Sequence, residues 1–159
     1  EYPDANQLAD MAKSAARVVK LFGFDPKVAF LSHSTFGQPV TDRTKRISDA
    51  VEILKSSNVD FKFDGEMQPD VALEEVYKEL YPFSEIVGSS NVLIMPSQHS
   101  AAISYKMIKS MSRAKVIGPL LIGLGLPIEI APLRSSTSEI INLASIAAYS
   151  ADVIDYKKN

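Results

Sequence analysis

The chain of 159 residues contains no cysteine. That absence excludes disulfide bonds, thiolate metal sites and cysteine nucleophiles, and it is compatible with a cytoplasmic protein. No apolar run approaches the roughly 18–20 residues that span a bilayer, and no block of lysine and arginine marks a nucleic-acid footprint. With a net charge of −2, the sequence predicts a cytoplasmic protein that has neither nucleic acid nor a membrane as its partner.

Several motifs of catalysis and ligand binding are missing as well. The sequence has no G-x-S-x-G nucleophile elbow, no Walker lysine, no G-x-G-x-x-G fingerprint and no EF-hand spacing, which disfavours the sites that those motifs build. It opens with Glu1 in place of an initiator methionine and shows no signal-peptide pattern. We interpret residues 1–159 as one domain that is a fragment of a longer polypeptide.

Hydrophobic residues make up 46% of the sequence, enough for an ordinary core. Continuous apolar runs at 27–32 and 91–96 are typical of strands buried on both faces. Further strands are predicted over 59–65, 114–123 and 127–133, and helices over 8–22, 41–54, 70–81, 99–111 and 135–154. Strands that alternate with helices predict an α/β fold in three layers, with a mostly parallel sheet covered by helices on both faces.

Two polar segments follow predicted buried strands. They read SHSTFG (32–37) and PSQHSA (96–101), and they hold the only two histidines, His33 and His99. The carboxyl ends of parallel strands meet at one edge of the sheet, where ligands bind in such folds. We therefore expect both segments at a common ligand-binding edge.

The SHSTFG segment has three possible interpretations. A catalytic serine beside its base is disfavoured, because neighbouring side chains on extended backbone point to opposite faces. An anion cradle would use hydroxyls and free backbone N–H groups ahead of a helix, and Ser32, Ser34, Thr35 and Gly37 supply them. A plain polar turn explains the same residues equally well, so these two interpretations stay open.

Acidic residues gather at Asp64, Glu66 and Asp70, which offer oxygen ligands to magnesium or calcium. A structural interpretation is favoured over a metal site, with Asp64 in a turn before glycine and Asp70 as a helix cap. Lys106 is either a point charge that reaches a phosphate or a solvated helix lysine. Ser136 and Glu139 have the capping-box spacing.

Five segments resemble, in order and spacing, the carboxyl-terminal half of phosphate acetyltransferases: VAFLSHSTFG, DGEMQPDVAL, YPFSEIVGSSNVLIMP, SYKMI and VIGPLLIGLGLPIEI. The variants YPFSEIVG, MPSQHSA and VIGPLLIGLGLPIEIAPL are more similar to the phosphotransacetylase-like domain that ends bacterial large-type NADP-dependent malic enzymes. The resemblance covers nearly the whole chain and implies the second lobe of a phosphotransacetylase-like fold.

The resemblance also implies a catalytic Ser-Arg pair before the last helix, with an acid seven positions after the serine. Aligned without gaps, the pair falls on Pro132 and Leu133, and the acid on Glu139. A shift of one residue would bring Arg134 near the arginine position, but it would leave Leu133 in place of the serine. Because the Ser-Arg pair is missing, no catalytic residue is expected in this chain.

The resemblance also implies that the helix lysine of the family, which matches Lys106, lies on the coenzyme A side.

From the resemblance we expect a regulatory and oligomerisation domain that binds acetyl-CoA or a related CoA ester and is catalytically silent. The upstream domain of the parent enzyme would convert malate to pyruvate by oxidative decarboxylation, with NADP and Mg or Mn. A homo-oligomer, dimeric or higher, is expected, and no cofactor or metal in this domain itself. The expected ligand residues are Ser32, Ser34, Thr35, Gly37, His99, Lys106 and Arg134. The alternatives are an active phosphate acetyltransferase and a dimerisation module whose ligand site has decayed.

Overall fold

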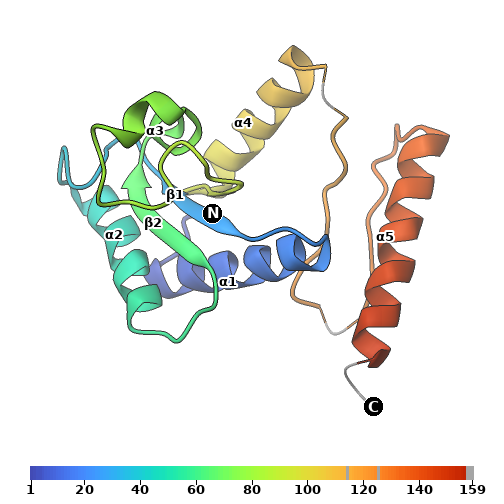
Figure 1. The fold of residues 1–159 in the computed structure, drawn as a ribbon. Helices are drawn as coiled ribbons and strands as arrows, with labels where there is room; N and C mark the ends of the chain where they lie inside the picture. Colours follow the sequence, from blue (N-terminus) through green and yellow to red (C-terminus); the bar gives the residue numbers. More distant parts are fainter. Residues whose placement is uncertain (114, 125, 157–159) are drawn as a thin grey trace. The chain divides into compact units, whose positions relative to one another are not determined.

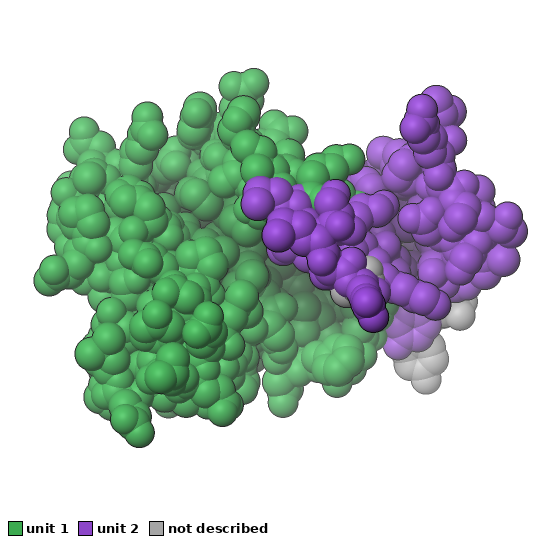
Figure 2. Space-filling view, turned by 90° about the horizontal axis from the view of Figure 1, so that it is seen from above, with its two compact units in different colours: residues 1–106 green, residues 107–159 purple. Residues whose placement is uncertain are grey.

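The computed structural model describes residues 1–113, 115–124 and 126–156, and the chain forms two compact units. The first unit comprises residues 1–106 and the second residues 107–159, coloured green and purple in Figure 2. Helix α4 (Gln98–Met111) begins in the first unit and ends in the second. No described helix is both long and apolar enough to cross a membrane.

A parallel three-stranded sheet forms the centre of the first unit (Figure 1), in the order β2-β1-β3. The strands are β1 (Lys27–Leu31), β2 (Lys62–Met67) and β3 (Val92–Ile94). In the central strand β1, Val28 pairs with Phe63 on one side and Val92 on the other. The predicted parallel α/β architecture is confirmed, although β2 lies about three residues later than the alternating pattern at 59–65 indicated.

Helices α1 (Ala5–Leu21) and α2 (Asp42–Lys55) cover one face of this sheet (Figure 1). Each begins with a capping box, in which Asp4 pairs with Gln7 and Thr41 with Thr44. The core that they share with the sheet consists of Leu8, Ala9, Ala12, Ala16, Val28, Phe30, Ile47, Ala50, Val51, Leu54, Val92 and Ile94. Apart from Leu8, the buried residues of α1 are alanines, whose small side chains permit a close approach to the sheet.

The opposite face carries the short helix α3 (Pro69–Leu73) and the 3-10 turn η1 (Glu75–Lys78). They enclose a second core of Ala29, Leu31, Met67, Val71, Ala72, Ile86 and Val87. Helices on both faces give the expected three layers.

The prediction of one continuous helix over 70–81, capped by Asp70, is wrong. Helix α3 begins at Pro69 after Gln68 and ends at Leu73. The carbonyl oxygens of Val71 and Ala72 would continue an α-helix by accepting from the amides four residues later. Instead they accept from Gly88 (2.9 Å) and Ser90 (3.1 Å) of a returning loop. That loop therefore ends the helix.

In the second unit, helix α5 (Thr137–Tyr156) is preceded by a long connection. The predicted strands at 114–123 and 127–133 are wrong where the structure describes them, since 115–124 and 127–133 contain no strand. Residue 114 lies outside the described part of the chain. Apolar composition suggested strands, but a strand also needs a neighbour with which to exchange backbone hydrogen bonds. Pro119 has no N–H to contribute, and Leu121 and Ile128 stay 40% and 47% exposed.

Candidate functional site

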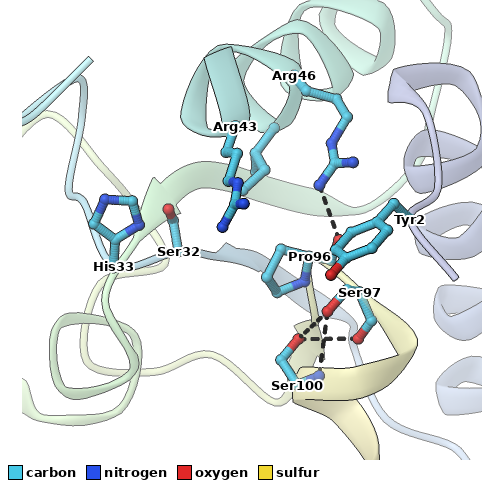
Figure 3. Close-up of a pocket in the computed structure, with 9 residues that line it drawn as sticks. Tyr2, Ser32, His33, Arg43, Arg46, Pro96, Ser97 and Ser100 are labelled. Carbon is cyan, nitrogen blue, oxygen red and sulfur yellow. Dashed lines mark hydrogen bonds between the residues drawn. The ribbon is translucent and has the colours of Figure 1, made fainter. Parts of the chain in front are cut away.

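A cleft of about 430 Å³ opens where β1 and β3 end (Figure 3). Its lining consists of Tyr2, Ser32, His33, Arg43, Arg46, Ile47, Pro96, Ser97 and Ser100. The structure thus brings residues of the SHSTFG and PSQHSA segments into one cleft, together with the first turns of α2. All of these residues belong to the first compact unit.

Two arginines that the sequence analysis did not single out, Arg43 and Arg46, extend from α2 into this cleft (Figure 3). A guanidinium N–H of Arg46, on Nη2, donates to the carbonyl oxygen of Pro96 at 3.0 Å. Its Nε is buried and has no partner among the described residues. Neither arginine forms an ion pair within the described part of the chain. The sequence did offer one signal. A cation near the start of a helix opposes the helix dipole, so an arginine at the start of the helix predicted over 41–54 suggests a role other than helix stability.

Two serines line the cleft at the start of α4. The amide of Ser100 donates to Oγ of Ser97 at 3.2 Å, and the two hydroxyls lie 3.0 Å apart. The Ser100 hydroxyl can also donate to the Ser97 carbonyl oxygen at 2.9 Å. Ser97 therefore has the role of a helix cap, and this cap places two hydroxyl groups in the lining of the cleft.

The SHSTFG segment folds around the buried carboxylate of Glu66, whose residue is 1% exposed. Oε1 accepts from the Ser34 hydroxyl at 2.8 Å and from the Gly37 amide at 2.6 Å, and Oε2 accepts from the Ser48 hydroxyl. Burial raises the pKa of Glu66, but the hydrogen bonds from Ser48, Gly37 and Ser34 outweigh it, so the pKa is lowered overall. Glu66 therefore ties the segment to β2 and α2 as a charged acceptor.

This arrangement uses backbone N–H groups that an anion cradle would need. The amide of Thr35 donates to Gln38, the amide of Phe36 to the Glu66 carbonyl oxygen, and the amide of Gly37 to the Glu66 carboxylate. The Thr35 hydroxyl accepts from the Gln68 amide at 3.1 Å.

Of the segment's residues, Ser32 and His33 line the cleft. Ser34, Thr35 and Gly37 are outside its lining and bond to Glu66 or Gln68. Direct ligand contact by those three residues stays a prediction.

The other predicted ligand residues lie outside the cleft lining. His99 and Lys106 are exposed on α4, and the Lys106 ammonium lies 5.8 Å from the ring centroid of Tyr105. Arg134 is exposed and belongs to the second compact unit. A ligand role for these residues also stays a prediction.

The second unit contains the residues aligned with the family's catalytic positions. Leu133 is fully exposed. The Glu139 carboxylate accepts from the Ser136 amide (2.7 Å) and hydroxyl (2.9 Å), so the predicted capping box is confirmed. The Ser136 amide and hydroxyl lower the pKa of Glu139, with a smaller contribution from Lys109. Glu139 therefore has a complete set of structural partners.

The acidic residues of the 64–70 segment have separate roles. Asp64 lies within strand β2, so the predicted turn at this position is wrong; its carboxylate accepts from the Gly65 amide at 2.9 Å. Asp70 accepts from the Tyr77 hydroxyl at 2.8 Å. Glu66 holds the SHSTFG segment. The described residues contain no group of three histidines or carboxylates arranged to hold a metal ion.

Comparisons with known proteins agree on one family. The family described as phosphate acetyl/butaryl transferase matches residues 1–148. An NADP-dependent malic enzyme of Rhizobium meliloti (strain 1021) is 47% identical over 151 residues, which are 95% of this chain and 20% of that protein. A phosphate acetyltransferase of Bacillus subtilis (strain 168) is 36% identical over 150 residues, 94% of this chain and 46% of that protein.

The fold agrees with solved structures as well. A phosphotransacetylase from Streptococcus pyogenes superposes with a TM-score of 0.88 at 35% identity, covering 94% of this chain and 46% of that one. The chain therefore spans about a fifth of the malic enzyme and less than half of the phosphate acetyltransferase and phosphotransacetylase chains that it matches.

Proposed function

Because the chain belongs to the phosphate acetyl/butaryl transferase family, we propose that it is the acetyl-CoA-sensing part of a cytoplasmic NADP-dependent malic enzyme and transfers no acetyl group itself. The upstream part of that enzyme would oxidise and decarboxylate malate to pyruvate with NADP and Mg or Mn. Acetyl-CoA, or a related CoA ester, would bind here and report carbon supply. The similarity to malic enzymes along nearly the whole chain supports this assignment of the parent enzyme.

The observation that carries ligand binding is the cleft at the carboxyl ends of β1 and β3. Among the residues that the structure describes, its lining has two arginines and no carboxylate, so it favours a ligand with negative charge. Its position follows the general rule for ligand sites in open parallel α/β sheets. Coenzyme A esters carry several phosphate groups, and they suit such a cleft.

Catalytic silence is supported by the residues aligned with the family's Ser-Arg pair. Pro132 has no hydroxyl and Leu133 has no charge, so neither can orient a thiol or stabilise the negative charge of a phosphate transition state. Glu139, aligned with the family's acid, accepts hydrogen bonds at the start of α5. These roles differ from those that acetyl transfer requires.

Regulation would follow if acetyl-CoA has different affinities for two states of a homo-oligomeric parent enzyme, because a ligand shifts an equilibrium only by its differential affinity. The first test is a calorimetric titration of acetyl-CoA into the purified chain, together with malate kinetics of the full-length enzyme at rising acetyl-CoA. We expect binding by the chain and a change in malate turnover. Malate kinetics indifferent to acetyl-CoA would contradict the sensing role.

Two variants locate the ligand. His33 lines the cleft and is exposed, so His33→Ala should weaken acetyl-CoA binding without unfolding the domain. Lys106→Ala should weaken acetyl-CoA binding only if the ligand extends from the cleft along α4. Phosphate-dependent turnover of acetyl-CoA is measured on the same samples, and a rate above background would show an active transferase in place of a silent one.

A further inference from the structure

We propose that Arg43 and Arg46 form a clamp for a phosphate or diphosphate group, completed by the hydroxyls of Ser97 and Ser100. Where that group is part of a CoA ester, the inference rests on the proposed function and names the part of the ligand that the cleft recognises. The shared chemistry is an anion whose negative charge lies on the oxygens of tetrahedral phosphorus. Its sources are a free phosphate or the phosphates of a larger ester.

The positive charge of the two arginines is uncompensated within the cleft lining. Arg43 and Arg46 are the charged residues of the cleft lining, and the lining contains no aspartate or glutamate. Arg43 is exposed and Arg46 is partly buried, with its Nε atom shielded from water, and a buried guanidinium N–H needs an acceptor. Here the described residues offer Arg46 a single carbonyl oxygen, that of Pro96, and leave its buried Nε–H unpaired. An anion in the cleft would supply the missing acceptor.

The position of the two arginines on α2 also favours an anion between them. They are three residues apart, so their side chains leave the same side of the helix. Arg43 also lies in the first turn of α2, where the positive end of the helix dipole disfavours cations. The position of Arg43 therefore costs helix stability, and that cost is offset once an anion sits between the two arginines.

Helix α4 contributes hydroxyl groups to the same cleft. Ser97 and Ser100 line the same cleft at the N-terminal end of α4, a helix of 14 residues. Two helix N-termini and two guanidinium groups therefore act on one volume, and all four favour negative charge. Figure 3 shows the arginines on one side of this volume and the two serines on the other.

The geometry favours phosphate over a carboxylate. A guanidinium fork binds two oxygens of one anion, and a carboxylate has only two oxygens to share. A phosphate or diphosphate has enough oxygens for both arginines and for the serine hydroxyls. The cleft volume of about 430 Å³ leaves room for the remainder of an ester.

The test is calorimetry of the purified chain with pyrophosphate as the probe, repeated with inorganic phosphate, acetyl-CoA and phosphate-free pantetheine. Arg43→Ala and Arg46→Ala should each weaken pyrophosphate binding about tenfold or more, as expected for a lost charge-assisted hydrogen bond. Lys45→Ala is the matched control, because Lys45 is an exposed cation on the same helix outside the cleft lining. It should change the affinity less than about twofold. Arg46→Lys keeps the positive charge but loses the two-pronged guanidinium group. Its pyrophosphate affinity should therefore lie between those of the wild type and Arg46→Ala.

Equal losses in Lys45→Ala and in the arginine variants would overturn the clamp, because general charge would then explain the binding. Unchanged pyrophosphate affinity in both arginine variants would overturn it as well. Urea unfolding shows whether each variant is folded. If Arg46→Ala does not fold, the affinity of Arg43→Ala tests the clamp, because Arg43 is exposed and its replacement should leave the fold intact.

If acetyl-CoA binds with the same affinity in both arginine variants as in the wild type, the clamp is contradicted but the proposed function is not. Arginine-dependent pyrophosphate binding without acetyl-CoA binding would support the clamp and contradict the proposed function. Arginine-dependent binding that is tighter for acetyl-CoA than for inorganic phosphate supports the clamp with an ester as the source.

Discussion

The hydroxyl of Ser34 donates a 2.8 Å hydrogen bond to the carboxylate of Glu66, 32 positions later in the chain. The same carboxylate accepts from the Gly37 amide and the Ser48 hydroxyl. One buried anion therefore joins the loop that carries Ser32 to α2, which carries both arginines of the cleft. The wall of the cleft depends on a residue that does not line it.

Replacing Glu66 by alanine should destabilise the domain by about 3 kcal/mol. The substitution removes the shared acceptor of the Gly37 amide and of the Ser34 and Ser48 hydroxyls, and each group left unsatisfied costs about 1–3 kcal/mol. The two hydroxyls keep weaker bonds, to Ser32 Oγ at 3.4 Å and to the Thr44 carbonyl oxygen at 3.3 Å. Glu66→Gln should cost less, about 1 kcal/mol, because its amide oxygen still accepts from Ser34 or Gly37. Urea unfolding at neutral pH measures both, and equal losses would show that the hydrogen bonds are not the cause.

The stability contributed by Glu66 should depend on pH. Folding lowers the pKa of this carboxyl, so its contribution is fully present above the ordinary glutamate pKa of about 4.3. It is lost as the pH falls through the lower pKa of the folded state. The free-energy difference between wild type and Glu66→Gln should therefore shrink on acidification. Exposed carboxyls with lowered pKa, such as Glu85 and Asp60, are common to both proteins and cancel in this difference.

Gly88→Ala should destabilise the domain more than Gly23→Ala. Both glycines have positive φ, +67° and +82° respectively, which costs an alanine about 1 kcal/mol or more. A methyl group on Gly88 would lie 2.6 Å from Cα of Glu75 and 2.7 Å from the Glu74 carbonyl oxygen, whereas one on Gly23 meets nothing within 4 Å. Urea unfolding of the two variants separates the clash from the backbone strain. Equal losses would show that the loop at Gly88 moves aside freely.

Thr41→Ala should lower stability by about 1 kcal/mol, because it removes the N-cap of α2. The Thr41 hydroxyl accepts from the Thr44 amide at 3.2 Å, and the Thr44 hydroxyl accepts from the Thr41 amide at 2.8 Å. Ser56→Ala is a suitable control, since Ser56 is at the opposite end of α2, where its exposed hydroxyl donates to the Ile53 carbonyl oxygen. Thermal unfolding should show a smaller loss for Ser56→Ala than for Thr41→Ala.

The sequence by itself determined the parallel α/β class and the capping box of Ser136 and Glu139. Hydrophobic runs and cap residues act over a few positions, so their pattern can be read along the chain. It also indicated that the segments after β1 and β3 would share one edge, because all strands of a parallel sheet end on the same side. The side chains that line this edge were only partly predicted. Ser32 was among the expected ligand residues, His33 was only placed in the segment at the edge, and Arg43 and Arg46 were missed.

Only the tertiary structure decided which groups bond across long separations. Helix α3 ends early because the Gly88 amide donates to the Val71 carbonyl oxygen. Glu66 holds the SHSTFG segment because Ser34, Gly37 and Ser48 all donate hydrogen bonds to its carboxylate. The segments at 115–124 and 127–133 are apolar enough for strands but form none, since no local pattern supplies a pairing partner. Propensity belongs to a segment, whereas each hydrogen bond needs a second group whose position depends on the folded chain.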